Sequence, residues 1–182
     1  MTNRAVRLGR SPMVAALAVG VALGGATSAS AAESTAGSTA GGMSASAASR
    51  LGPYGYGSLK LRMSAKQAQR TGEIVKKRND ESCSGWDLKG HPTPKDSVGL
   101  FISKKQGLAA IFAPKGVRTP EGIGIGSTMK QLKRAYPHLV APPVAFPFTT
   151  VPGNRKASYF FLLSHGKVYE MALVLKGQDC FN

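Results

Sequence analysis

The stretches that decide the fold are Ser64-Ala65-Lys66-Gln67 and Thr128-Met129-Lys130-Gln131. In each, Ser64 or Thr128 can accept a hydrogen bond from a free backbone donor of the first helical turn. The glutamine three positions later, Gln67 or Gln131, can bond back to the cap. Each stretch is followed by a lysine-rich helical segment and then by strand-like segments. The recurrence predicts two tandem copies of one helix-plus-strand unit, at about residues 58–117 and 118–182.

The remaining elements follow from the apolar pattern. In the first unit we expect a helix at 65–71, a polar connection at 76–82, a strand at 84–88, and a hairpin of 98–103 and 108–113. In the second we expect a short strand at 123–125, a helix at 129–136, and a hairpin of 157–163 and 168–175. The predicted class is α+β, with the antiparallel strands of both units in one sheet and both helices packed on one of its faces.

Residues 1–31 have the pattern of an export signal. Arg4, Arg7 and Arg10 form a basic region, residues 13–25 form a short apolar run, and Ala29-Ser30-Ala31 fits a signal-peptidase site. A transmembrane anchor is the alternative, but the run is shorter than the roughly 20 residues that a membrane-spanning helix needs. We therefore predict a secreted, extracellular protein without a transmembrane anchor.

Residues 32–55 are predicted to be a flexible tether. From 32 to 49 the chain is mostly Ala, Ser, Gly and Thr, which lack the apolar side chains needed to offset the entropy of ordering. Residues 50–55 add Gly, Pro and Tyr. We place the folded domain at 56–182, which is enough chain for one hydrophobic core.

The charge is strongly positive. The full chain has 24 Lys and Arg against nine Asp and Glu, a formal net charge of +15. Removal of residues 1–31 takes away three of the basic residues and leaves 21 against nine, or +12. Such a charge attracts anionic partners through a field that salt screens. A solvated surface that aids solubility is the alternative.

Cys83 and Cys180 are the only two cysteines, and both follow the predicted signal. In an oxidising compartment they most simply form one disulfide, which would close a loop of about 97 residues. Two free thiols or an intermolecular bridge are the alternatives that the sequence leaves open.

The two helix starts resemble a known family. Leu61-Arg62-Met63-Ser64-Ala65-Lys66-Gln67-Ala68 and Ile125-Gly126-Ser127-Thr128-Met129-Lys130-Gln131-Leu132 are similar to a start found in the β-lactamase inhibitory proteins of streptomycetes. That start reads apolar residue, Gly, Met, Ser or Thr, two variable residues, Gln and an aliphatic residue. It also occurs in the small outer-membrane lipoproteins of the BamE (SmpA) type. In the inhibitors, two tandem units of a helix and four strands place the concave face of a sheet against a target enzyme.

The resemblance covers the two helix starts and the order of elements from about 58 to 176, and it has three departures. Arg62 stands where the family has glycine, the single cysteine pair spans both units, and the chain is strongly basic. The resemblance implies the fold and binding to a protein, including inhibition of an extracellular enzyme. It does not imply β-lactamase as the target.

No constellation of residues indicates catalysis. His91, His138 and His165 lie far apart in the sequence, and none has another metal-ligand type at the spacing of a metal site. No nucleophile-elbow motif selects a serine. The glycines of 122–126 alternate with isoleucines, which indicates a strand with a close approach of another backbone, or a bulge, rather than a phosphate-binding loop. We expect no enzymatic activity, no cofactor and no metal; a small hydrolase is the alternative.

The aromatic residues indicate a binding surface. Alternation puts Tyr159, Phe161 and Leu163 on one face of a strand, and Phe160 and Leu162 on the other. Because helices cover one face of the sheet, we expect the other face to bind a partner. The candidate surface residues are Trp86, Tyr159, Phe161, Tyr169 and Met171, with Trp86 in the core as the alternative.

The sequence therefore predicts a secreted, monomeric, non-catalytic module that binds an extracellular protein. The alternative is a cationic protein of the cell envelope that binds anionic wall polymers or lipid headgroups. Nucleic acid is not an expected partner, because base-stacking aromatic residues are not interleaved with Lys and Arg.

Overall fold

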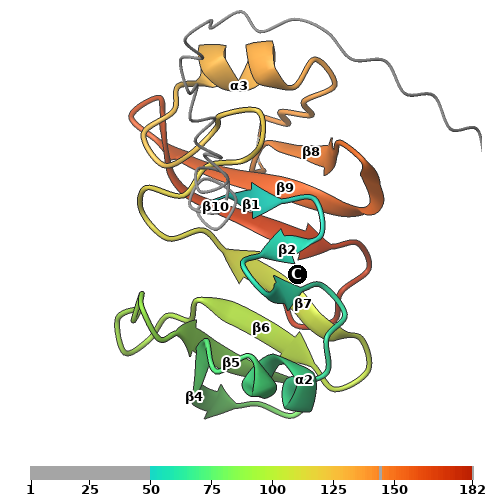
Figure 1. Ribbon diagram of the computed structural model, residues 1–182. Coiled ribbons are helices and arrows are strands. Elements are labelled where there is room, and N and C mark those ends of the chain that lie inside the picture. The colour runs from blue at the N-terminus through green and yellow to red at the C-terminus, as the bar shows by residue number, and fades with distance from the viewer. Residues whose placement is uncertain (1–49, 144, 182) are drawn as a thin grey trace, which may run out of the picture. The chain divides into compact units, whose positions relative to one another are not determined.

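The computed structural model describes residues 50–143 and 145–181, which form two antiparallel sheets and two short helices (Figure 1). The elements are β1 (Leu51–Gly52), β2 (Gly55–Tyr56), β3 (Leu59–Lys60), α2 (Ala65–Arg70), β4 (Ile74–Asn79), β5 (Cys83–Leu88), β6 (Leu100–Ser103), β7 (Gly107–Phe112), α3 (Met129–Ala135), β8 (Phe148–Val151), β9 (Asn154–Ser164) and β10 (Lys167–Leu175). The predicted export signal and most of the predicted tether, residues 1–49, lie outside the described residues.

The main sheet has seven strands in the order β4-β5-β6-β7-β10-β9-β8. Each of its six pairings is antiparallel. Strands β4 to β7 follow one another in space as they do in the sequence, and so do β8 to β10. The two groups meet where β7 pairs with β10, so the last strands of both groups lie at the centre of the sheet and β4 and β8 are its edges (Figure 1).

Both helices start at the capping boxes that the sequence predicts. The side chain of Ser64 accepts a hydrogen bond from the N–H of Gln67, and the side chain of Thr128 accepts one from the N–H of Gln131. Each glutamine side chain bonds back to the N–H of its cap. The helices have only six and seven residues, because Gly72 at φ +74° follows the first and Pro137 follows the second.

The segment before each helix is bonded to the start of a central strand in the same way. In both places an N–H on the helix side donates to a carbonyl of the strand, and the same strand residue donates back. The bonds are Arg62 N to Leu108 O (2.9 Å), Leu108 N to Met63 O (2.7 Å), Gly126 N to Val168 O (2.7 Å) and Val168 N to Ser127 O (2.8 Å). The two helix starts are therefore fixed to β7 and β10 in matching positions.

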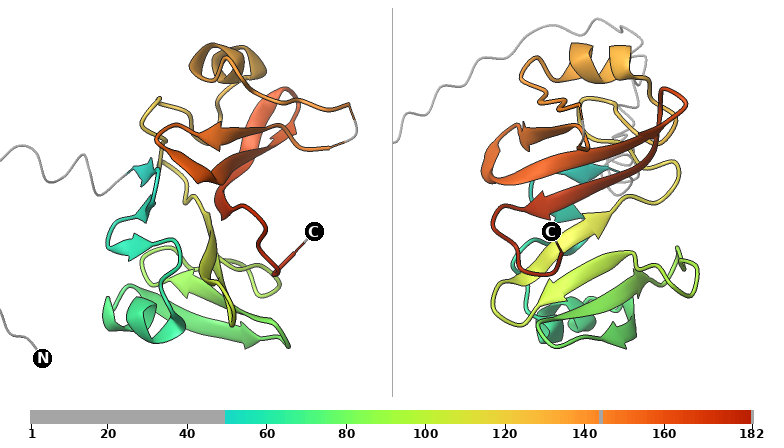
Figure 2. Two further views of the ribbon diagram at one scale, coloured as in Figure 1. Left: turned by 90° about the vertical axis from the view of Figure 1, so that its right-hand side faces the viewer. Right: turned by 180° about the vertical axis from the view of Figure 1, so that it is seen from behind.

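One hydrophobic core lies between the main sheet and the elements that cover it. Ala68 of α2 and Leu132 of α3 are both fully buried in this core, together with Leu51 and Leu59 of the small sheet. Figure 2 shows α2 and the small sheet on one side of the main sheet and the C-terminal segment on the other. We call the side with α2 and α3 the helix face and the opposite side the open face.

The small sheet β1-β2-β3 corrects the predicted start of the folded domain. Leu51 is fully buried, its N–H donates to the carbonyl of Arg118, and its own carbonyl accepts a bond from the hydroxyl of Tyr159 at 2.8 Å. Residues 50–55 are therefore part of the fold rather than of a tether. The pattern did not indicate this, because strands of two residues are too short to show alternation.

The predicted fold class is also corrected. The protein is mainly β, with only two short helices, rather than α+β with two helix-and-strand units.

The largest local error concerns the segment 76–82, predicted as a polar connection. Residues Ile74–Asn79 form edge strand β4, paired with β5. Lys77 forms an ion pair with Asp87, and Lys76 lies over the ring of Trp86. These tertiary contacts place basic side chains in a strand, and charged residues are common on edge strands.

The predicted disulfide is present, and Cys83 of β5 is bonded to Cys180 near the C-terminus. The bond holds the segment after β10 against the open face, where Cys180 and Phe181 pack with Phe101 and Phe112. It also indicates an oxidising compartment. Neither described helix has the length and apolar character required to cross a membrane.

Candidate functional site

The predicted surface residues fall on the wrong face of the sheet, with one exception. Trp86, Tyr159, Phe161 and Met171 are at most 3% exposed and face the helices, so a partner cannot reach them in the folded protein. The predicted alternation does separate the two faces of β9. The prediction is wrong about which face is free, because Tyr159 and Phe161 lie on the face that α3 and the small sheet cover.

Tyr169 is the exception, with 51% of its surface exposed. The register between β9 and β10 shifts between Val168 and Glu170, so Tyr169 is left out of the regular alternation. It therefore does not join the other four predicted residues.

The open face contains a groove, which we call the aromatic groove, with a volume of about 640 Å³. Its floor is one cross-strand row, in which Phe112 of β7 pairs with Ala172 of β10, Ala172 with Phe160 of β9, and Phe160 with Phe148 of β8. Residues in register on one face stand side by side. Because Ala172 has only a methyl group, the row is hollow between Phe112 and Phe160.

The walls of the groove come from segments outside the strands. Phe181 closes one side, with its ring 6.3 Å from that of Phe112 and 5.4 Å from that of Phe101. On the other side the wall is Phe146 from the loop before β8, which is 55% exposed, next to Phe148 of the floor, whose ring stacks on that of Phe160 at 5.4 Å. Five of the seven phenylalanines of the chain thus line the groove. The sequence signal that could have found it is Glu170, whose charge marks its side of β10 as the solvent side.

Two charged residues line the aromatic groove, Glu170 and Lys176. Glu170 lies on the same side of β10 as Ala172 and Val174, and Lys176 continues this row of alternate residues just after the end of the strand. Lys176 donates to the hydroxyl of Thr150 at 2.8 Å. Glu170 is half-buried beside Leu162, its cross-strand neighbour, and desolvation by the surrounding apolar side chains raises the pKa of its carboxyl.

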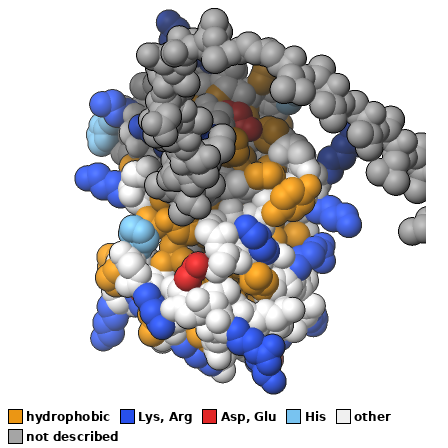
Figure 3. Space-filling view, in the orientation of Figure 1, with side chains coloured by type: hydrophobic (Ala, Val, Ile, Leu, Met, Phe, Trp, Pro, Cys, Tyr) orange, Lys and Arg blue, Asp and Glu red, His pale blue; other side chains and the backbone are white. Residues whose placement is uncertain are grey.

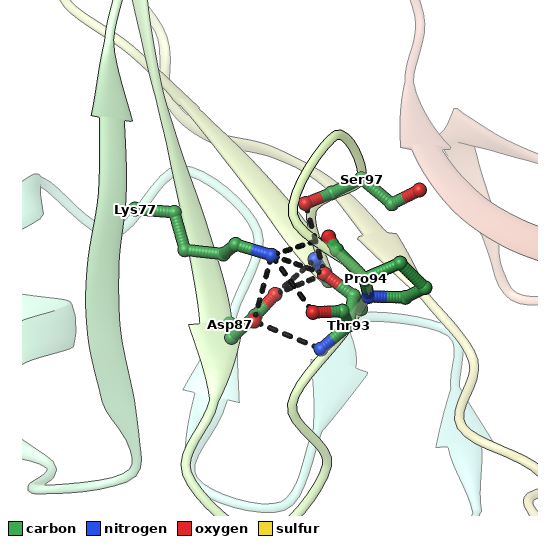
Figure 4. Close-up of polar contacts among 6 residues, drawn as sticks. Lys77, Asp87, Thr93, Pro94 and Ser97 are labelled. Carbon is green, nitrogen blue, oxygen red and sulfur yellow. Dashed lines mark hydrogen bonds and ion pairs between the residues drawn. The ribbon is translucent and has the colours of Figure 1, made fainter.

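A second polar cluster lies at the other end of the sheet, around the carboxylate of Asp87 (Figure 4). This carboxylate accepts bonds from the N–H and hydroxyl of Thr93, at 2.9 and 2.7 Å, and from the N–H of Gly99 at 3.0 Å. Lys77 Nζ lies 3.3 Å from it and also donates to the carbonyl of Pro94. Burial alone would raise the pKa of Asp87, but the bonds from Thr93, Gly99 and Lys77 outweigh it and lower the pKa.

The Asp87 cluster has a structural role. Its donors come from the loop between β5 and β6 and from β4, so it ties that loop to the sheet edge. All of its buried side-chain polar atoms are bonded. These bonds within the protein account for the burial of the carboxylate without a bound ligand.

The histidines are separate in space as well as in sequence. His91, His138 and His165 are all exposed, and His165 lies in the turn between β9 and β10, where its Nδ1 is 2.9 Å from the hydroxyl of Ser164. Within the described ranges, the one group of potential metal ligands close enough to share an ion is Cys83, Asp179 and Cys180. Its two sulfurs are joined in the disulfide, so they cannot act as thiolate ligands.

The glycine-rich stretch has a backbone role. Gly124 lies so close to Val117 that a Cβ atom would come within 2.8 Å of the Val117 carbonyl oxygen. The Ser127 hydroxyl, which is buried, accepts a bond from the N–H of Gly124 at 3.1 Å. Ile123 and Ile125 do not form the short strand that the sequence predicts; an isolated bridge between Arg118 and Gly124 stands in its place.

The basic residues do not gather into one patch on the face seen in Figure 3, where they are spread around its outline. Residues 50–181 contain 21 Lys and Arg against eight Asp and Glu. In this part of the chain two ion pairs form, Lys77 with Asp87 and Arg78 with Asp80. Most of the positive charge is therefore not neutralised within the domain.

Comparison of the chain with models of known protein families, with curated proteins and with solved structures gave no match.

Proposed function

We propose that this chain is a secreted, non-catalytic protein that binds a segment of another extracellular protein in the aromatic groove. The observation that carries the proposal is the groove itself, in which phenylalanines surround the small side chain of Ala172 on the open face. Contiguous exposed apolar surface of this kind is typical of interaction sites, and pockets lined by apolar residues with a few polar groups are typical of binding sites.

Secretion is supported by the disulfide and by the composition of residues 1–31. A single disulfide between the only two cysteines fits an oxidising compartment outside the cytoplasm. The basic start, short apolar run and Ala-Ser-Ala stretch fit an export signal. We propose that the exported chain is a monomer until it meets its partner.

The matching contacts before the two helices support a relationship between the halves of the sheet. Residues 62–64 and 126–128 have the same order of a strand-bonded residue, a second strand-bonded residue and a helix cap. We propose that the halves are tandem copies of one unit, as in the inhibitor family that the helix starts resemble. In that family the partner is an enzyme. The proposed binding therefore includes inhibition of an extracellular enzyme.

The experiment compares proteins retained by the purified exported chain and by variants. Ala172→Leu fills the floor of the groove, and Phe146→Ser removes an exposed aromatic wall. Val75→Ala is the control, because Val75 is 47% exposed on edge strand β4, outside the groove. Culture supernatant is passed over each form and bound proteins are identified by mass spectrometry.

The proposal requires one protein that both the wild type and Val75→Ala retain and that both groove variants lose. Its affinity is then measured with purified partner, and the partner is assayed for inhibition if it is an enzyme. Equal retention by all four forms, each with an unchanged thermal midpoint, would contradict the role of the groove.

A second candidate is a cationic protein that binds anionic wall polymers or lipid headgroups. The excess of basic residues, with only two ion pairs in the described chain, favours it. Binding to isolated cell walls would then fall steeply with salt, because exposed ionic contacts are screened over about 10 Å at 0.1 M ionic strength. It would also be insensitive to Ala172→Leu, whereas binding in the groove is sensitive to it.

A further inference from the structure

Glu170 is a carboxylate without a partner in an apolar groove. It is the only acidic residue that lines the aromatic groove, and within residues 50–143 and 145–181 no hydrogen bond or ion pair to it is formed. Its neighbours along and across the strands are Leu162 and Ala172. Desolvation of a charged group in such surroundings costs free energy, and a cation that binds beside it offsets this cost.

Among the residues that the structure describes, the groove offers no cation of its own to Glu170. Lys176, the other charged residue of the lining, lies six residues further along the chain, just after the end of β10, which is about 20 Å in an extended chain. Its ammonium group donates to the Thr150 hydroxyl instead. A cation that pairs with Glu170 must therefore come from the bound molecule.

The dimensions of the groove favour a polypeptide as this molecule. Its lining runs from Glu170 of β10 to Lys176, just after the end of that strand, a length of about 20 Å that matches about six residues of extended chain. Across the strands, Phe112, Phe160 and Phe148 offer apolar surface on both sides of Ala172. A lysine or arginine side chain fits such a site, because its aliphatic stem can lie on apolar surface while its charged end reaches a carboxylate.

We propose that the aromatic groove binds an extended segment of the partner protein in which one Lys or Arg is flanked by apolar residues, with the basic side chain paired to Glu170. This inference rests on the proposed function, because it names the class of segment that the groove selects. The segment carries a single basic residue. The domain is itself strongly positive and repels a segment that has many basic residues.

The test selects peptides from a displayed library of random dodecapeptides on the purified exported chain. Parallel selections use the wild type, Ala172→Leu, Phe146→Ser and Glu170→Gln. On the wild type we expect peptides with one Lys or Arg among apolar residues. Ala172→Leu, which fills the groove, and Phe146→Ser, which removes a wall, should both fail to enrich them, and Glu170→Gln should enrich apolar peptides without the basic residue. Thermal midpoints of all four forms establish that they are folded.

One selected lysine peptide is then titrated against an analogue in which norleucine replaces the lysine. Norleucine keeps the aliphatic stem and removes the charge. On the wild type the lysine peptide should bind about tenfold more tightly, as expected for a hydrogen bond to a charged group. On Glu170→Gln the two peptides should bind equally.

The outcomes separate this inference from the proposed function. Selected peptides that depend on the groove but show no basic residue would overturn the role of Glu170 and leave the groove as a binding site. Peptides that bind all four forms equally, or the absence of any selected peptide, would overturn both. Self-association of the wild type that Ala172→Leu abolishes would make a second copy of this chain the occupant and would also overturn the inference.

Discussion

Arg62 and Gly126 have the same backbone conformation at the same place relative to a capping box. Each lies two residues before the helix cap, with φ at +71° and +91°, and each donates its N–H to the first part of a central strand. The left-handed region is ordinary for glycine and costs other residues roughly 1–2 kcal/mol. The chain thus holds a non-glycine residue in a conformation for which its second half uses glycine.

Replacement of Arg62 by glycine should therefore stabilise the protein. We expect Arg62→Gly to raise the free energy of unfolding by about 0.5–1 kcal/mol, the relief of strain less the larger chain entropy that glycine gives the unfolded state. The side chain of Arg62 is exposed, so little packing is lost. Urea denaturation measures the change.

Two variants control for other effects of this substitution. Arg62→Ala removes the same charge but keeps a Cβ at positive φ, so its stability should stay near that of the wild type. Gly126→Ala should lose about 1 kcal/mol, and the loss is purely conformational because a Cβ at Gly126 meets nothing within 4 Å. Equal stability of Arg62→Gly and Arg62→Ala would show that the backbone at Arg62 is not strained.

The disulfide is expected to stabilise both the fold and the groove. Reduction, or the double variant Cys83→Ala with Cys180→Ala, should lower the free energy of unfolding by up to about 4–5 kcal/mol, because the bond closes a loop of 97 residues. It should also release Phe181 from Phe101 and Phe112 and so remove one wall of the aromatic groove. Thermal unfolding with and without reductant measures the first effect.

Truncation of the chain after Cys180 provides the matched control for the second effect. It keeps the disulfide and removes only Phe181 and the residue after it. Peptide binding should weaken in the truncated chain as it does in the double variant, while stability should fall much less than in the double variant, because only the packing of Phe181 is lost. An undiminished peptide affinity in both forms would mean that Phe181 is not a wall of the binding site.

The parts of the fold that could be predicted are those set by local interactions. A capping box joins residues three positions apart, so both helix starts could be predicted from the sequence. The hairpins of β6 with β7 and of β9 with β10 could also be predicted. In each, apolar runs flank a turn that has a glycine at positive φ, which is Gly107 in the first and Gly166 in the second. Neither depends on contacts with distant parts of the chain.

The parts that could not be predicted depend on distant contacts. Lys76, Lys77 and Arg78 read as a solvated connection, and only the presence of Asp87, Trp86 and Phe101 beside them explains a strand. The two faces of β9 could be separated but not assigned to helix and solvent. That assignment depends on which face β1, α2 and α3 cover, and the alternation of one strand does not contain it.

Asp87 should contribute stability that is lost at low pH. Its pKa is lowered in the folded state, so folding is favoured above the ordinary carboxyl pKa near 4, and the contribution disappears as the pH falls through the lower folded value. We expect Asp87→Asn to lower the free energy of unfolding by about 2 kcal/mol at pH 7, because the partly buried Lys77 loses its counter-ion. Urea denaturation of both forms from pH 2 to 7 measures this, and the difference should shrink in the acid range. A difference that does not change with pH would mean that the carboxylate charge is not involved.

Glu170 should behave in the opposite way. Its pKa is raised by burial, so the folded protein binds the proton more tightly than the unfolded chain, and stability rises as the pH falls through the folded pKa. Glu170→Gln should then raise the free energy of unfolding by about 0.5–1 kcal/mol at pH 7, and the gain should vanish below pH 4, where the wild type is also neutral. Urea denaturation of both forms across this range gives the two values.

The same variant separates a structural from a binding role for Glu170. A structural carboxylate loses stability when it is replaced, as Asp87 should, whereas a carboxylate kept for binding gains stability and loses its ligand. We therefore expect Glu170→Gln to be more stable than the wild type and to bind the lysine peptide about tenfold more weakly. Leu162→Ala, which removes an apolar neighbour without changing charge, is the control and should lower stability at every pH. A less stable Glu170→Gln would indicate that the carboxylate has a partner within the fold, and that the cation it needs is already supplied by this chain.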